Sequence, residues 1–120
     1  MRKFIKFETF SDKRGNLTVL EKKIPFNIQR IFYIYGVDQS ERGFHRHKLT
    51  RQVAIAINGS CEIIIQKKEK QLKYHLDSPK KGLLIEPEDF HWMKNFTKDC
   101  ILLVIASTKF NKEDYIYARV

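Results

Sequence analysis

Short strand-like segments follow one another along almost the whole chain, and their regular spacing constrains the fold more than any other feature. Residues 4–10 and 71–76 alternate apolar with polar side chains, which is typical of a strand with one buried face. Turn residues separate the segments, and the Asn58-Gly59 pair between two apolar runs is a strong hairpin signal. Because helical periodicity is nearly absent, the pattern predicts an all-β sandwich or barrel of roughly nine or ten strands.

Length and charge limit the classes of protein to consider. At 120 residues the chain can build one hydrophobic core, so we expect a single domain over residues 1–120. The balance of 23 Lys and Arg against 14 Asp and Glu gives a net charge of +9, which attracts anions such as nucleic acid, acidic membranes or phosphorylated small molecules. The basic residues are scattered and form no block typical of a nucleic-acid-binding arm. We therefore expect an anionic partner that is not a nucleic acid.

No segment predicts insertion into a membrane or export across one. The N-terminal residues contain no long apolar stretch, and no run approaches the roughly 18 apolar residues of a spanning helix. Cys61 and Cys100 lie inside apolar runs without CxxC spacing, so we expect buried free thiols. These features predict a soluble, cytoplasmic protein with no membrane partner.

Two of the segments are apolar on both faces, namely residues 53–57 and 100–106. An antiparallel sheet normally leaves one face in contact with water. The outer face of these strands must therefore be covered, either by another segment of the chain or by a second subunit. We expect a homodimer.

The stretch around two closely spaced histidines is the first candidate for chemistry. His45 and His47 are separated by one residue, so in a strand both side chains project from one face, while Arg46 and Lys48 project from the other. A pair of imidazoles suits metal binding or proton transfer near neutral pH, although a surface turn is the simpler alternative. We expect the histidine face to lie in phase with Val53, Ile55 and Ile57.

The spacing of residues beyond this pair resembles the two-part signature of the cupin superfamily. The residues that carry the resemblance are His45, His47, Gln52 and Gly59, followed by Gly82, Pro87, His91 and Asn95. The resemblance implies a jelly-roll barrel of two antiparallel sheets whose histidines face a central cavity. Gln52 stands where metal-binding cupins usually carry glutamate.

Within the cupins, the chain resembles the nucleotide-linked sugar 3,4-ketoisomerases over nearly its whole length. The matching segments are Gly15, Leu17 and Glu21; Arg30 with Phe32-Tyr33; residues 42–52; Asn58-Gly59-Ser60; residues 76–79 with Gly82 and Leu83; residues 87–93; Ala106-Ser107; and residues 114–116. The resemblance implies an isomerase that converts dTDP-4-keto-6-deoxyglucose to a dTDP-3-keto-6-deoxyhexose, a precursor of dTDP-linked amino sugars.

The reaction and the resemblance together suggest roles for particular residues. Moving a carbonyl from C4 to C3 requires a base with a pKa near 7 but no metal or redox cofactor, which favours histidine. The resemblance implies His47 as the base at carbon, His45 as its partner or proton relay, and Tyr33 as a donor to the sugar oxygens. The expected substrate-binding residues are Arg42, near the oxyanion or the diphosphate, together with His91, Arg30 and Gln52.

Four residues depart from the family's pattern. Arg46 replaces the small residue that usually separates the histidines, and Phe90 replaces the usual tryptophan before His91. Trp92 follows that histidine, and Thr108 stands where an acidic residue is common. None of these changes removes a candidate for proton transfer.

The alternative interpretation is a metal-dependent cupin such as an iron- or manganese-dependent dioxygenase. His45, His47 and His91 would then be the ligands, with Gln52 as a weak fourth. The missing glutamate argues against this, because a carboxylate holds a divalent cation better than a neutral amide does. A third possibility is a cupin that binds a sugar or an anion without catalysis.

Overall fold

The computed structural model describes residues 3–117 and is almost entirely β-structure. The described part contains twelve strands and one 3-10 turn, η1, which precedes the last strand. The elements are β1 (Phe4–Lys6), β2 (Glu8–Asp12), β3 (Gly15–Val19), β4 (Arg30–Ile34), β5 (Arg42–His47), β6 (Gln52–Asn58), β7 (Cys61–Lys67), β8 (Lys70–Leu76), β9 (Lys81–Ile85), β10 (Phe90–Lys94), β11 (Ile101–Ala106), η1 (Lys112–Asp114) and β12 (Tyr115–Ile116).

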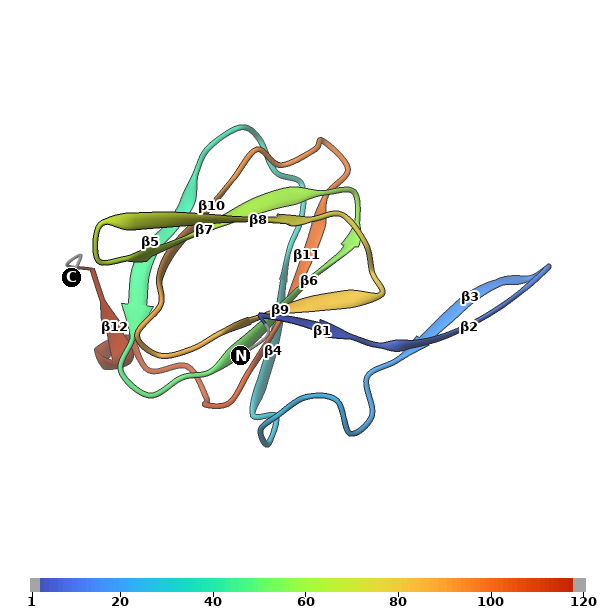
Figure 1. Cartoon of the computed structure of the whole chain (residues 1–120), viewed down its shortest axis with the longest axis horizontal. Coiled ribbons are helices and arrows are strands. Elements are labelled where there is room, and N and C mark those ends of the chain that lie inside the picture. Colours follow the sequence, from blue (N-terminus) through green and yellow to red (C-terminus); the bar gives the residue numbers. More distant parts are fainter. Residues whose placement is uncertain (1–2, 118–120) are drawn as a thin grey trace.

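Two five-stranded antiparallel sheets form the body of the molecule (Figure 1). The β6 sheet has the strand order β1-β9-β6-β11-β4, and the β5 sheet has the order β12-β5-β10-β7-β8. The β2–β3 hairpin forms a separate two-stranded unit that extends away from both sheets (Figure 1). This arrangement confirms the predicted all-β jelly roll of the cupin type.

The space between the two sheets holds the main hydrophobic core. Ala54 and Ala56 of β6 face this core, and Ile63 and Ile65 of β7 face it from the other sheet. The expectation that the inward face of β6 contains Val53, Ile55 and Ile57 was therefore wrong by one residue. The turn between β5 and β6 breaks the alternation, so the phase of the histidines does not carry over to β6.

The outer face of strand β6 and of its neighbours β9 and β11 is covered by the chain itself. Val53 and Ile55 pack there with Phe7, Leu84 and Ile105. Half-buried side chains from the N-terminal region, namely Ile5, Leu20, Ile24 and Phe26, complete this second cluster. Of the two explanations for strands that are apolar on both faces, the structure confirms a covering segment. The homodimer stays a prediction.

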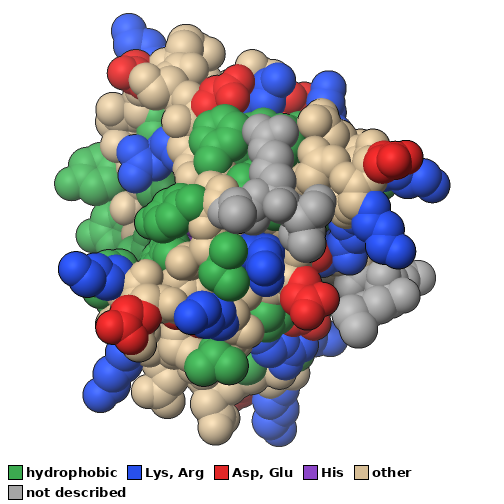
Figure 2. Space-filling model, turned by 90° about the vertical axis from the view of Figure 1, so that its left-hand side faces the viewer, with side chains coloured by type: hydrophobic (Ala, Val, Ile, Leu, Met, Phe, Trp, Pro, Cys, Tyr) green, Lys and Arg blue, Asp and Glu red, His purple; other side chains and the backbone are tan. Residues whose placement is uncertain are grey.

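Charged side chains are spread over the surface in the way that the sequence suggested. On the face seen in Figure 2, Lys and Arg lie among acidic and hydrophobic side chains instead of forming one block. Cys61 and Cys100 are buried free thiols, as predicted, and burial raises the pKa of Cys61 to about 12. Within residues 3–117, no helix has the length and apolar character to span a membrane.

The β6–β7 hairpin turns at Gly59, whose φ of +64° lies in the left-handed region. A Cβ at this position would collide with Thr97 and approach Cys100 Cα at 2.9 Å. Gly36 has the same φ of +64°, but nothing lies within 4 Å of the place where its Cβ would be. Alanine substitutions at the two positions can therefore be compared to separate the cost of backbone strain from the cost of steric crowding.

We predict that Gly59→Ala lowers the free energy of unfolding by about 3 kcal/mol, since it adds overpacking to the cost of a left-handed alanine. Gly36→Ala, the matched control, should lower it by only about 1 kcal/mol. Urea denaturation of both variants measures the difference. Equal losses would show that the hairpin is not closely packed against residues 97–100.

Candidate active site

Three of the predicted site residues, His45, His47 and His91, lie together on neighbouring strands. His45 and His47 belong to β5, and His91 on β10 pairs directly with His45. The ring centroid of His45 is 5.0 Å from that of His47 and 5.0 Å from that of His91. The centroids of His47 and His91 are 6.2 Å apart. The antiparallel pairing thus brings together residues that are more than forty positions apart in the sequence.

His47 is oriented by a buried carboxylate. Its Nδ1 lies 2.9 Å from Oδ2 of Asp114, and the two side chains are only 1% and 8% exposed. Asp114 also accepts hydrogen bonds from the backbone N–H of Leu49, at 2.7 Å, and from the hydroxyl of Thr50. These contacts keep Asp114 ionised. Burial alone would raise the pKa of its carboxyl, but the bonds from Thr50, Leu49 and His47 lower it below its usual value.

Thr108, one of the departures from the family's pattern, belongs to the same network. Its hydroxyl lies 2.6 Å from the hydroxyl of Thr50, which in turn donates to Asp114. A threonine can therefore support the carboxylate indirectly at a position where an acidic residue would place a second negative charge.

His91 is fixed by the backbone. Its side chain is fully buried, and its Nδ1 lies 2.8 Å from the carbonyl oxygen of Asp89. A carbonyl oxygen only accepts, so Nδ1 carries the proton and Nε2 is the basic nitrogen. Burial, together with the positive charge that His45 and His47 would carry if protonated, lowers the pKa of His91 to about 4.

The other two histidines are also held towards the neutral form. Burial lowers the pKa of His45, and the neighbouring His47 lowers it further. Burial likewise lowers the pKa of His47, although the bond to Asp114 works in the opposite direction. The Nε2 atoms of His47 and His91 are buried and have no hydrogen-bond partner in the described part of the chain. The site thus contains two basic nitrogens whose lone pairs have no partner within residues 3–117.

Arg30 lies beside this cluster, as predicted. It belongs to β4, and its positive charge lowers the pKa of His47. The guanidinium carbon lies 5.6 Å from the ring centroid of Phe32 and 5.8 Å from that of Phe110. The Nε and one terminal nitrogen of Arg30 are buried without a hydrogen-bond partner in the described chain. Such a cation is available to an anionic group.

Gln52 begins strand β6 and is 3% exposed. Since it alternates with Val53, it shares the face of β6 that turns Ala54 towards the space between the sheets. The structure therefore places Gln52 on the barrel interior, as the cupin resemblance implies.

Tyr33 and Arg42 do not join the histidines within this subunit. Tyr33 is 61% exposed on the outer face of β4, where alternation turns Phe32 inwards in its place. Arg42 lies at the opposite end of β5 from His47, is exposed, and lines a small pocket with Asp38 and Ser40. The role of Tyr33, which the resemblance implied, therefore gains no support from the geometry within this subunit.

Tyr115 was missed by the sequence analysis, which used residues 114–116 only as part of a resemblance. Strand β12 pairs Tyr115 with His47. The tyrosine ring centroid lies 4.5 Å from that of His47 and 4.8 Å from that of His45. Only the long-range pairing of β12 with β5 reveals that Asp114 and Tyr115 belong to the site.

The metal interpretation gains no support from this geometry. Across residues 3–117, no three His, Cys, Asp or Glu side chains are arranged to hold a metal ion.

Comparisons with known proteins agree with the fold and show the family to which the chain belongs. The family described as "FdtA: WxcM-like, C-terminal" matches residues 1–119. TDP-4-oxo-6-deoxy-alpha-D-glucose-3,4-oxoisomerase of Aneurinibacillus thermoaerophilus is 41% identical over 117 residues, which cover 95% of this chain and 84% of that protein.

Solved structures give the same result. QdtA, a sugar 3,4-ketoisomerase from Thermoanaerobacterium thermosaccharolyticum solved in complex with TDP, has a TM-score of 0.93 and 41% identity, over 96% of this chain and 86% of that chain. A mutant of the same enzyme in complex with TDP-4-keto-6-deoxyglucose has a TM-score of 0.93 and 40% identity, with the same coverage. The chain therefore belongs to the FdtA family, described as WxcM-like, C-terminal, and it is a 3,4-ketoisomerase of nucleotide-linked sugars.

Proposed function

We propose that His47 is the base that isomerises dTDP-4-keto-6-deoxyglucose to a dTDP-3-keto-6-deoxyhexose in this chain. The observation that carries the proposal is the buried, unpartnered Nε2 of His47, whose Nδ1 is held by Asp114. The base takes the proton from C3, and the electrons of that C–H bond form the C3–C4 double bond of an enediolate. Protonation of O4, loss of the proton on O3 and protonation of C4 then give the 3-keto product.

Asp114 positions His47 for this step. The bond between the carboxylate and Nδ1 directs the Nε2 lone pair into the site, and the negative charge stabilises the imidazolium that forms when Nε2 takes a proton. No step requires a metal ion or a redox cofactor.

His45, His91 and Tyr115 are the candidates for the remaining proton movements. His45 lies 5.0 Å from each of the other two imidazoles, so it can relay a proton between them. His91 presents its own basic Nε2 and contacts the sugar or carries the second proton. In this proposal Tyr115 replaces Tyr33 as the donor to the sugar oxygens, because Tyr115 packs on the histidine rings.

Arg30 and Gln52 complete the proposed site. A guanidinium with buried, unpartnered nitrogens stabilises the developing negative charge on O4 or holds the diphosphate. Gln52 supplies an amide that hydrogen-bonds a sugar hydroxyl. Arg42 has no role at the histidines of its own subunit in this proposal. A substrate of this kind supports a cytoplasmic location, with no membrane or nucleic-acid partner.

We predict that His47→Asn abolishes isomerisation, with a loss of about 10²- to 10⁴-fold, which is typical of a general base. The assay incubates the enzyme with dTDP-4-keto-6-deoxyglucose in deuterated water and follows deuterium uptake and the 3-keto product by NMR. His75→Asn, at an exposed position on β8, is the matched control and should keep full activity. A folded His47→Asn enzyme with near wild-type turnover would remove His47 from the role of base.

Asp114→Asn should lower kcat by about tenfold or more, because the amide cannot stabilise the imidazolium as a carboxylate does. His47 works as a base only when neutral, so kcat/KM falls as the pH drops through its pKa. Asp114 raises that pKa against the effect of burial, and removing its charge lowers the pKa. The acidic limb of the pH profile should therefore move to lower pH.

Asp77→Asn is the control for this experiment, since Asp77 is exposed and pairs with His75 and Lys81 instead of with a histidine of the site. It should leave the pH profile unchanged. A loss of activity in Asp114→Asn without a shift of the acidic limb would mean that Asp114 supports only the fold of the terminal segment.

A homodimer remains part of the proposal. Strand β4 is at an edge of its sheet and exposes Ile31, Tyr33 and nearby Tyr35, which are 56%, 61% and 68% accessible. The projecting hairpin exposes Phe10 and Leu17. Exposed apolar groups along an unpaired strand edge favour association with a second chain.

Light scattering should therefore give a mass of twice the 14.3 kDa of one chain. Ile31→Glu places a charge on the exposed face of β4 and should shift the mass towards that of one chain. Lys73→Glu, on exposed strand β8, is the control and should leave the dimer intact. A wild-type mass of 14.3 kDa would contradict the dimer.

A further inference from the structure

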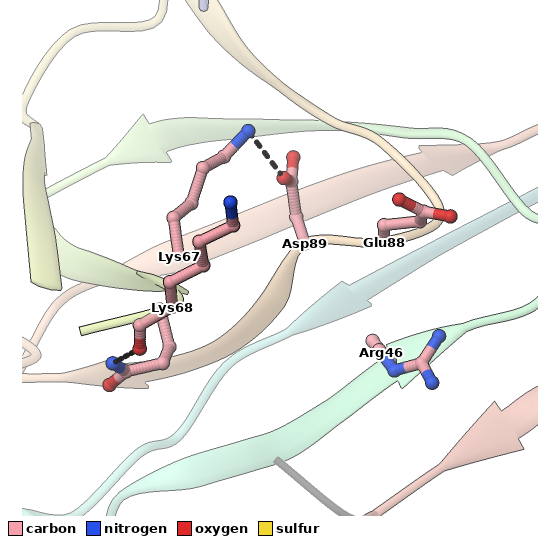
Figure 3. Close-up of a pocket in the computed structure, with 6 residues that line it drawn as sticks. Arg46, Lys67, Lys68, Glu88 and Asp89 are labelled. Carbon is pink, nitrogen blue, oxygen red and sulfur yellow. Dashed lines mark hydrogen bonds and ion pairs between the residues drawn. The ribbon is translucent and has the colours of Figure 1, made fainter. Parts of the chain in front are cut away.

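Arg46 lies between the two histidines of β5 in the sequence, but its side chain faces a different part of the molecule. Since it alternates with His45 and His47, its side chain projects from the opposite face of the strand. There it lines a pocket of about 510 Å³, which we name the Arg46 pocket. The other lining residues are Gln66, Lys67, Lys68, Glu88 and Asp89, and Figure 3 shows them around the hollow.

Asp89, the buried acid of this pocket, already has its ion-pair and hydrogen-bond partners. Asp89 is 2% exposed and pairs with Lys3 and with Lys67, whose Nζ lies 3.2 Å from Oδ1. It also accepts the backbone N–H of Glu86 at 2.8 Å. These contacts lower the pKa of its carboxyl against the effect of burial, so Asp89 stays ionised. Neither Asp89 nor Lys67 is free to neutralise the other charges of the pocket.

Two cations of the pocket remain without a partner in the described chain. Arg46 makes no ion pair or side-chain hydrogen bond there, and its Nε is buried. Lys68 makes no ion pair through its side chain within residues 3–117. Glu88 is the one uncommitted acid among the lining residues and pairs with neither of them (Figure 3). The uncommitted groups therefore carry a net positive charge.

A buried guanidinium N–H without an acceptor is costly, which points to a ligand that supplies one. The planar fork of arginine matches the oxygens of phosphate or carboxylate, and charge-assisted bonds of this kind are the strong ones. A phosphate group carries close to two negative charges at neutral pH and so matches two unpaired cations. The volume of the pocket leaves room for more than a single ion.

We propose that the Arg46 pocket binds a phosphate group, either as free inorganic phosphate or as part of a small phosphorylated metabolite. Arg46 binds two phosphate oxygens through its guanidinium, Lys68 supplies a second cation, and Gln66 adds a polar side chain at the rim. The pocket is separate from the site of isomerisation, because the histidines project from the other face of β5. Its existence does not depend on the mechanism proposed for His47.

The test observes Arg46 directly by two-dimensional ¹⁵N NMR of arginine Nε–H groups. The Arg46 signal is assigned by its absence in Arg46→Lys. Inorganic phosphate and, in a second arm, glucose 6-phosphate are titrated into the labelled wild-type enzyme; neither carries the nucleotide of the proposed substrate. We expect a saturable shift of the Arg46 signal with at least one of the two. A shift with phosphate alone identifies the free anion, and a shift with glucose 6-phosphate alone identifies a phosphorylated metabolite.

The affinity of the pocket is then measured by calorimetry with the titrant that shifts the signal. Arg46→Ala should weaken binding at this site by about tenfold or more, because it removes the charge-assisted bonds. Arg14→Ala changes the charge equally at an exposed hairpin position and should bind like the wild type. The proposal is overturned if neither titrant shifts the Arg46 signal, or if folded Arg46→Ala binds with unchanged affinity.

Discussion

Hydrogen bonds at Nδ1 of His47 and His91 determine which nitrogen of each ring can act as a base. A carboxylate holds one ring and a backbone carbonyl holds the other, so both place their lone pairs at Nε2. Burial adds the second condition, because it favours the neutral form over the imidazolium. Buried imidazoles without these two partners would be free to take the other tautomer. The proposed chemistry depends on this pattern more than on the number of histidines.

The jelly roll supplies both partners from distant parts of the chain. Asp114 comes from the turn before β12, and β12 is held against β5 by the pairing of Tyr115 with His47. Asp89 precedes β10, and its side chain is fixed by Lys3 at the start of the chain. The ends of the described chain thus stabilise the orientation of histidines that belong to its middle. A change in either terminal segment will act on the site through these contacts.

Local patterns in the sequence predicted what depends on neighbouring residues. Alternation placed His45 and His47 on one face, and turn chemistry placed the hairpin at Gly59. The offset to His91 required the cupin resemblance, since no local rule pairs β10 with β5. The phase of β6 was wrong because the turn after His47 resets the alternation. The resemblance implied Tyr33 as a site residue, whereas β4 turns Phe32 inwards and leaves Tyr33 exposed.

Asp114 and Tyr115 could not be found from local patterns at all. A two-residue strand such as β12 has no periodicity of its own, and its function comes from long-range pairing with β5. Arg46 was recognisable as unusual from the sequence, but its surroundings were not. Only the structure reveals that it lines a pocket on the other face of β5.

The central claim is that His47 and His91 are neutral with the proton on Nδ1, and the ¹⁵N chemical shifts of the labelled imidazoles test it most directly. At pH 7 both rings should show a protonated Nδ1 and an unprotonated Nε2, and His91 should remain neutral well below pH 6. Exposed His75, which lies outside the site, provides an internal reference in the same spectra. Protonation of His47 at Nε2 at pH 7, as the other tautomer or as the imidazolium, would contradict the account.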